Sequence, residues 1–213
     1  MKKQLFNGYT AALMGSLLMA SVFSTFTHAE IALGEAQAPV TVIEYGSLTC
    51  DYCVRFHREV LPSVRAQHID NGQVRFIFRH YPTSAAAMRG AVAASCAGDH
   101  SYQMLDQLFT SIKSWAQAEE LDNALIEQAS AIGLNRTTFR ACLNDPQSER
   151  SVVHEQQQAF AELGVRGTPT FIINGLMVTG IKNSAQFELL IQKALKGATS
   201  STTRADISNT HQE

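Results

Sequence analysis

Two cysteines three positions apart carry the strongest chemical signal in the chain, the motif Cys50-Asp51-Tyr52-Cys53. They follow a run of β-favouring residues, 40–45, and open a stretch with the helical spacing of apolar residues that reaches about Gln67. At the start of a helix, backbone N–H groups and the helix dipole favour the nucleophilic thiolate form of a cysteine. Cys53 lies one turn further on, so it can close a disulfide with Cys50. This placement predicts dithiol–disulfide exchange, with Cys50 attacking and Cys53 resolving the mixed disulfide.

A zinc site is the alternative use of a CxxC pair. It would need two further ligands near by at ligand spacing, and neither Cys96 nor Cys142 belongs to a second CxxC pair. We therefore expect neither a metal ion nor an organic cofactor.

The order of the predicted elements is βαβ, then helices, then ββα. The first unit comprises a strand at 40–45, a helix at 50–67 with a break at Pro62, and a strand at 73–79. Residues 84–163 hold four or five helices and no strand. A hairpin follows at 170–179 around Asn174-Gly175, the strongest short turn signal in the chain, and a last helix covers 184–195. We predict an α/β fold in which a helical insertion interrupts a core of strands and helices.

The first 29 residues differ in character from the rest. Lys2 and Lys3 precede an apolar run that is short for a membrane span, and Thr27-His28-Ala29 suits a signal peptidase. We predict a signal peptide at 1–29, hence export to the periplasm; an uncleaved anchor is the alternative. Both lysines lie in this segment, so the net charge of −2 becomes −4 on its removal. No basic stripe indicates nucleic-acid binding.

The second motif is Gly164-Val165-Arg166-Gly167-Thr168-Pro169-Thr170-Phe171. Together, VIEYGSLTCDYC and GVRGTPTFIINGLMVTG resemble the DsbA-like branch of the thioredoxin superfamily over about residues 36–195. The resemblance implies a thioredoxin fold and a cis peptide bond before Pro169, which lies against the active-site disulfide. It also implies that Thr168 receives an extended substrate by strand addition. An ordinary trans proline at the start of a strand is the alternative.

Glu44 lies six positions before Cys50 and matches the buried acid of that family. A carboxyl group in apolar surroundings can relay a proton to or from the resolving thiol of Cys53. A solvent-facing acid at a strand edge is the alternative. His57 could stabilise the Cys50 thiolate, but we expect it to be a surface residue of the helix.

Asp51 and Tyr52 tune the redox potential and contact substrate, by the same resemblance. The charge of Asp51 should oppose a nearby thiolate, and Tyr52 supplies no positive charge, so both indicate a weaker oxidant than the strongest family members. The threonine at position 168 is closer to the residue that isomerase-type members carry there than to that of the best-known oxidase. We predict an oxidase that introduces disulfides, with an isomerase or reductase as the alternative.

Cys96 and Cys142 fall on the apolar faces of two predicted helices. Related proteins carry a second disulfide in the helical domain, and the resemblance implies that this pair forms one. Closing a loop of about 46 residues would contribute on the order of 4 kcal/mol. Two buried, unpaired thiols are the alternative.

The resulting plan has five segments: a signal peptide, two parts of a thioredoxin-like domain separated by the insertion, and a flexible tail, at 1–29, 30–83, 84–163, 164–196 and 197–213. Only about ten residues precede the first strand after the cleavage site. No room remains for an N-terminal dimerisation domain, so we expect a monomer. The resemblance further implies exported substrate proteins with free cysteines and a DsbB-like membrane partner that recharges the site. A binding module or chaperone-like scaffold with a locked Cys50–Cys53 disulfide is the competing class.

Overall fold

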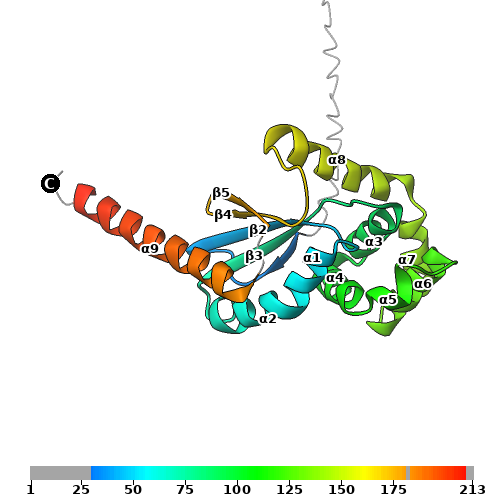
Figure 1. Cartoon of the computed structure of the whole chain (residues 1–213). Helices are drawn as coiled ribbons and strands as arrows, with labels where there is room; N and C mark the ends of the chain where they lie inside the picture. Colours follow the sequence, from blue (N-terminus) through cyan, green and yellow to red (C-terminus); the bar gives the residue numbers. More distant parts are fainter. Residues whose placement is uncertain (1–29, 181–182, 210–213) are drawn as a thin grey trace, which may run out of the picture.

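The computed structural model describes residues 30–180 and 183–209. Its centre is a five-stranded mixed sheet in the order β1-β3-β2-β4-β5 (Figure 1). Only β2 and β3 are parallel, and the other neighbours pair antiparallel. The strands are β1 Ile31–Leu33, β2 Val40–Gly46, β3 Val74–His80, β4 Thr170–Ile173 and β5 Leu176–Thr179.

The helical path after β2 is irregular but continuous. It passes through α1 Asp51–Arg55, a π-helical turn at Phe56–Val60, α2 Leu61–Val64 and a second π-helical turn at Arg65–Ile69. The irregularity expected at Pro62 takes the form of the π-helical turn that ends at Val60, with Pro62 in the first turn of α2. Proline donates no N–H and its ring crowds the carbonyl group four residues earlier, so regular α-helical bonding cannot run through it.

The remaining helices are α3 Ala85–Ser95, a 3₁₀ turn at Gly98–His100, α4 Ser101–Thr110, α5 Ile112–Trp115, α6 Leu121–Ala131, α7 Arg136–Leu143, α8 Pro146–Glu162 and α9 Ser184–Asn209. Helices α3 to α8 all lie between β3 and β4, within the stretch predicted to be helical. Trp115 is fully buried among them and donates its indole N–H to the carbonyl oxygen of Leu108. The fold is therefore a thioredoxin-like sheet with an inserted helical domain.

The two faces of the sheet are covered differently. On one face, Phe56 from the first helical path and Phe187 of α9 pack against Phe171 of β4, with ring centroids 4.7–5.0 Å apart. The other face is contacted by the last turns of α8, where Ala159 packs with Tyr45. Helices therefore cover both faces of the sheet at whose end the CxxC motif lies.

Two predicted boundaries require correction. The strand β1 was not predicted, because it has three residues and is defined by pairing with β3, as in Leu33 opposite Phe76. The last helix does not end at Leu195: α9 continues to Asn209 and takes up most of the segment assigned to a flexible tail. The predicted signal peptide, 1–29, lies outside the described residues. Within the described residues, no helix combines the length and apolar character needed to cross a membrane.

Candidate active site

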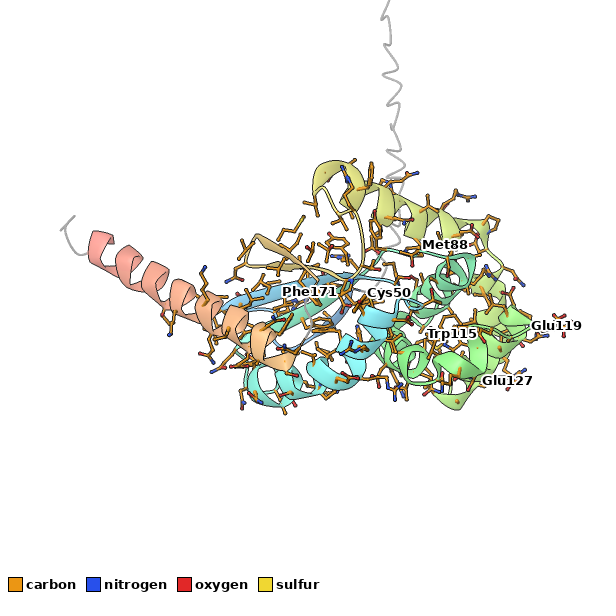
Figure 2. The ribbon with its side chains drawn as sticks, viewed as in Figure 1. Cys50, Met88, Trp115, Glu119, Glu127 and Phe171 are labelled. Atoms are coloured by element: carbon orange, nitrogen blue, oxygen red, sulfur yellow. A yellow bond between two sulfur atoms is a disulfide. The ribbon has the colours of Figure 1, made fainter. Side chains whose placement is uncertain are left out.

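Cys50 lies at the junction between β2 and the first helix, as predicted. It is the N-cap residue of α1, with an extended backbone, and its carbonyl oxygen accepts the first helical hydrogen bond from Val54 at 2.9 Å. Cys50 is partly exposed, whereas Cys53 is completely buried, and both are free thiols. Figure 2 shows Cys50 between the sheet, marked by Phe171, and the helical domain, marked by Met88 and Trp115. The first cysteine can meet a substrate and the second cannot.

The two thiols differ strongly in acidity. A hydrogen bond from the Cys53 thiol, together with the Thr168 side chain and the backbone N–H groups of Cys53 and Tyr52, lowers the pKa of Cys50 to about 5 against the opposing effect of burial. Burial raises the pKa of Cys53 far above its ordinary value, and the nearby Cys50 and Glu44 raise it further. At neutral pH Cys50 is therefore a thiolate and Cys53 a thiol, which is the division of roles that exchange chemistry requires.

The peptide bond between Thr168 and Pro169 is cis, as the resemblance implied. This turn places the carbonyl oxygen of Thr168 3.4 Å from the Sγ atom of Cys50, although 118 positions separate the two residues. Pro169 is buried and Thr168 is partly exposed. The backbone of Thr168 thus borders the reactive sulfur, where a substrate strand can reach both.

Glu44 is fully buried, in agreement with the expectation from its flanks. Its Oε2 atom lies 2.9 Å from Nε2 of His57. A Cβ atom on Gly46 would come within 3.0 Å of Glu44 Oε1, so the carboxylate lies directly against the backbone that leads to the CxxC motif. Ser47, the next residue, directs its N–H to Cys53 Sγ at 3.5 Å.

The expectation that His57 is a surface residue is wrong, because its side chain is 1% exposed. The position of His57 relative to Cys53 in the sequence would have predicted its burial. His57 follows Cys53 by four positions, so the two share the face of the helix that Phe56, Val60 and Val64 also bury.

Asp51 and Tyr52 are both exposed beside Cys50. Tyr52 is one of the large apolar side chains at the surface, at 58% exposure. On the side of Asp51, a groove of about 750 Å³ extends to Ile112 and Lys113 of the helical domain. These positions suit contact with a substrate, and their effect on the potential stays a prediction.

The remaining cysteines form the second disulfide that the resemblance implied. Cys96, which caps the C-terminal end of α3, is bonded to Cys142 on α7, and the two Cα atoms are 5.8 Å apart. The bond ties α3 and α7 of the insertion together. In the described part of the chain, no group of three or more His, Cys, Asp and Glu side chains could hold a metal ion.

A thioredoxin-like sheet, a CxxC pair at the start of a helix and a cis-proline turn against it define a thioredoxin-fold protein with a dithiol site. A family model described as thioredoxin matches residues 27–193, so the chain belongs to the thioredoxin family. Its structure is of the DsbA-like type. The crystal structure of α-DsbA1 from Wolbachia pipientis is similar with a TM-score of 0.74 and 29% identity, over 82% of this chain and 94% of that protein.

Two sequence relatives agree with this assignment. The chain is 26% identical over 171 residues to disulfide bond formation protein D of Bacillus subtilis, covering 78% of this chain and 77% of that protein. It is 24% identical over 169 residues to a Rickettsia conorii protein provisionally named a protein-disulfide oxidoreductase. That match covers 78% of this chain, and the chain spans 61% of the length of the Rickettsia protein.

Proposed function

We propose that the chain is an exported thiol:disulfide oxidoreductase that introduces disulfides into other proteins through Cys50 and Cys53. The observation that carries the proposal is the pairing of a partly exposed thiol of low pKa with a buried thiol of high pKa, both at the cis-proline turn. The names of two relatives, a protein-disulfide oxidoreductase and a disulfide bond formation protein, support it.

The reaction begins with the oxidised pair. A substrate thiolate attacks Sγ of Cys50, the Cys50–Cys53 bond breaks, and the electron pair and a proton go to the buried sulfur of Cys53. A second substrate thiolate then attacks the substrate sulfur of the mixed disulfide and releases Cys50 as a thiolate. A thiol of low pKa is a good leaving group, so the second step is fast and the reduced enzyme is stabilised. Both effects favour donation of the disulfide to the substrate.

The direction of electron flow separates the oxidase from the alternative, an isomerase or reductase. The low pKa of Cys50 favours the oxidase, because whatever stabilises the thiolate stabilises the reduced pair. Asp51 and Thr168 are the sequence features that favour the alternative.

Substrate recognition uses the surface around Cys50. An extended segment of the substrate pairs with the backbone of Thr168, and the groove beside Asp51 receives neighbouring side chains. The substrates are exported proteins with free cysteines, and a DsbB-like membrane protein reoxidises the pair. The protein acts as a monomer in the periplasm, after removal of residues 1–29.

The test is the reduction potential of the Cys50/Cys53 pair in the full chain, measured by equilibration with glutathione while Cys96 and Cys142 are monitored separately. A value near about −120 mV is that of a strong disulfide donor. A value near about −270 mV is that of a thioredoxin-like reductant and would make the isomerase or reductase the better assignment.

Trapping separates an enzyme from a scaffold with a locked disulfide. Cys53→Ala should accumulate mixed disulfides with reduced, unfolded proteins at Cys50, since the resolving thiol is gone. The matched control is Cys50→Ala, in which the buried Cys53 should trap nothing. Equal and negligible trapping by both variants would contradict the proposed exchange.

A further inference from the structure

The burial of His57 costs free energy that the packing of an aromatic ring does not require. The residue lies on the π-helical turn after α1, and its imidazole stacks on Phe109 with ring centroids 3.8 Å apart and an interplanar angle of 17°. Phe56 and Phe78 contact it edge-on. A phenylalanine would fill this aromatic site without the cost of burying polar nitrogen atoms. The Nδ1 atom of His57 is nevertheless buried without a hydrogen-bond partner among the described residues.

The burial of Glu44, the partner of His57, also costs free energy. The carboxylate is fully buried, Oε2 bonds to His57, and Oε1 has no hydrogen-bond partner among the described residues. Buried carboxylates with so few partners are rare in stable folds. Oε1 lies against Gly46, one residue before the N–H group that points at the sulfur of Cys53. The unsatisfied oxygen of Glu44 therefore lies against the backbone that leads to this N–H group.

Other ionisable groups border the pocket that holds Glu44 and His57. Cys53 lies on the same helical path, four positions before His57. On α4, burial raises the pKa of Tyr102 to about 12, with smaller contributions from Asp106 and Glu44, so its hydroxyl stays neutral. The side of β3 that faces His57 presents the rings of Phe76 and Phe78, and the imidazole of His80 lies edge-on to Phe78 with ring centroids 5.3 Å apart. Besides the larger effect of burial, the charge of Glu44 raises the pKa of the Cys53 thiol, so the Glu44–His57 pair acts electrostatically on the resolving cysteine.

We propose that His57 is a positioning residue that orients Glu44 beneath Cys53 and keeps one extra proton on the buried Glu44–His57 pair. This inference deepens the proposed function. When a thiolate attacks Cys50, the Cys50–Cys53 bond breaks and its electron pair goes to Cys53 Sγ. The proton held by the pair then moves through Glu44 to that sulfur. The pair is left as a carboxylate and a neutral imidazole, and it regains a proton from solvent before the next cycle.

Two substitutions separate proton storage from packing. His57→Gln keeps a donor for Glu44 but cannot bind the extra proton. His57→Phe keeps the aromatic stack on Phe109 but loses both the hydrogen bond and the proton. The control is His68→Gln, since His68 is also buried and bonded to a carboxylate, that of Glu188 on α9.

The assay is the rate of reduction of the Cys50–Cys53 disulfide by dithiothreitol in the full chain, corrected for the thiolate concentration of the reductant at each pH. We expect His57→Gln and His57→Phe to be slower by about 100-fold near pH 6, the low end of the effect of a positioned proton donor. The advantage of the wild type over both variants should shrink as the pH rises, because the pair then holds the extra proton less often. His68→Gln should match the wild type. Wild-type rates and pH profile in His57→Phe would show a packing role and overturn the inference.

A second measurement needs no variant in the active site. In histidine-labelled full chain, nuclear magnetic resonance should find that the imidazole signals of His57 respond differently to pH in the reduced and oxidised forms. Identical titration in both forms would refute proton transfer from the pair. Dithiothreitol reports on this step whether or not the chain oxidises proteins. Failure to oxidise proteins, with the His57 effects intact, would therefore contradict the proposed function alone.

Discussion

The low pKa of Cys50 makes the stability of the reduced protein depend on pH. In the folded chain this pKa is about 5, against an ordinary value of 9.0. The unfolded state therefore binds the proton more tightly, so the stabilisation is complete above about pH 9 and is lost as the pH falls through about 5. At pH 7 the contribution is limited to about 2.7 kcal/mol, from about 1.36 kcal/mol for each pH unit above the folded pKa. Screening at this partly exposed thiol reduces the expected gain to about 1–2 kcal/mol.

The perturbation that isolates this term is Cys50→Ser, because a serine hydroxyl does not titrate in the range. Denaturant unfolding of the reduced wild type and of the variant, from about pH 4 to about pH 8, gives the difference in free energy of unfolding. We expect the difference to be smallest at the acid end and to grow steadily above about pH 5. Cys96 and Cys142 stay bonded in both proteins, so their contribution cancels.

The same energy should appear in the redox equilibrium. Stabilising the reduced form by about 1–2 kcal/mol raises the reduction potential of the pair by about 20–40 mV. The ultraviolet absorbance of the thiolate provides an independent titration of Cys50. A constant stability difference across the pH range, or a thiolate titration centred near the ordinary pKa, would refute the assignment of Cys50 as the activated thiol.

Three further variants test the scaffold by denaturant unfolding. Replacing both Cys96 and Cys142 with Ala should lower the free energy of unfolding by on the order of 4 kcal/mol, since their bond closes a loop of 46 residues. A loss below about 1 kcal/mol would contradict this structural role. Phe109→Ala empties a buried aromatic site and should cost about 3–5 kcal/mol; an unchanged unfolding midpoint would contradict the packing described above. Gly90→Val should cost about 1–3 kcal/mol, because a Cβ atom there lies 2.9 Å from Leu48 and the Trp115 ring. Full stability of this variant would show that α3 can shift.

Elements with a strong local pattern were predictable from the sequence. The helices of the insertion carry apolar residues at helical spacing, and their ends carry local signals such as Asn135, whose side chain accepts from Thr137 and Thr138 at the start of α7. The hairpin between β4 and β5 turns at Asn174-Gly175, where both residues have positive φ angles. The extension of α9 beyond Leu195 escaped prediction, since residues 197–209 are polar and lack an apolar stripe.

The sequence alone determined the reactive pair, because a strand, a short connector and a helix fix Cys50 at a helix start and Cys53 one turn later. Backbone hydrogen bonding sets such distances within a single element. The spacing could not show that Thr168 borders Cys50 or that His57 binds Glu44. The first contact joins residues 118 positions apart. The contact between His57 and Glu44 depends on which face of the first helical path packs against the sheet and α4. Only the packed structure decides such contacts, since they follow from the topology of the sheet and from the side chains that surround each polar group.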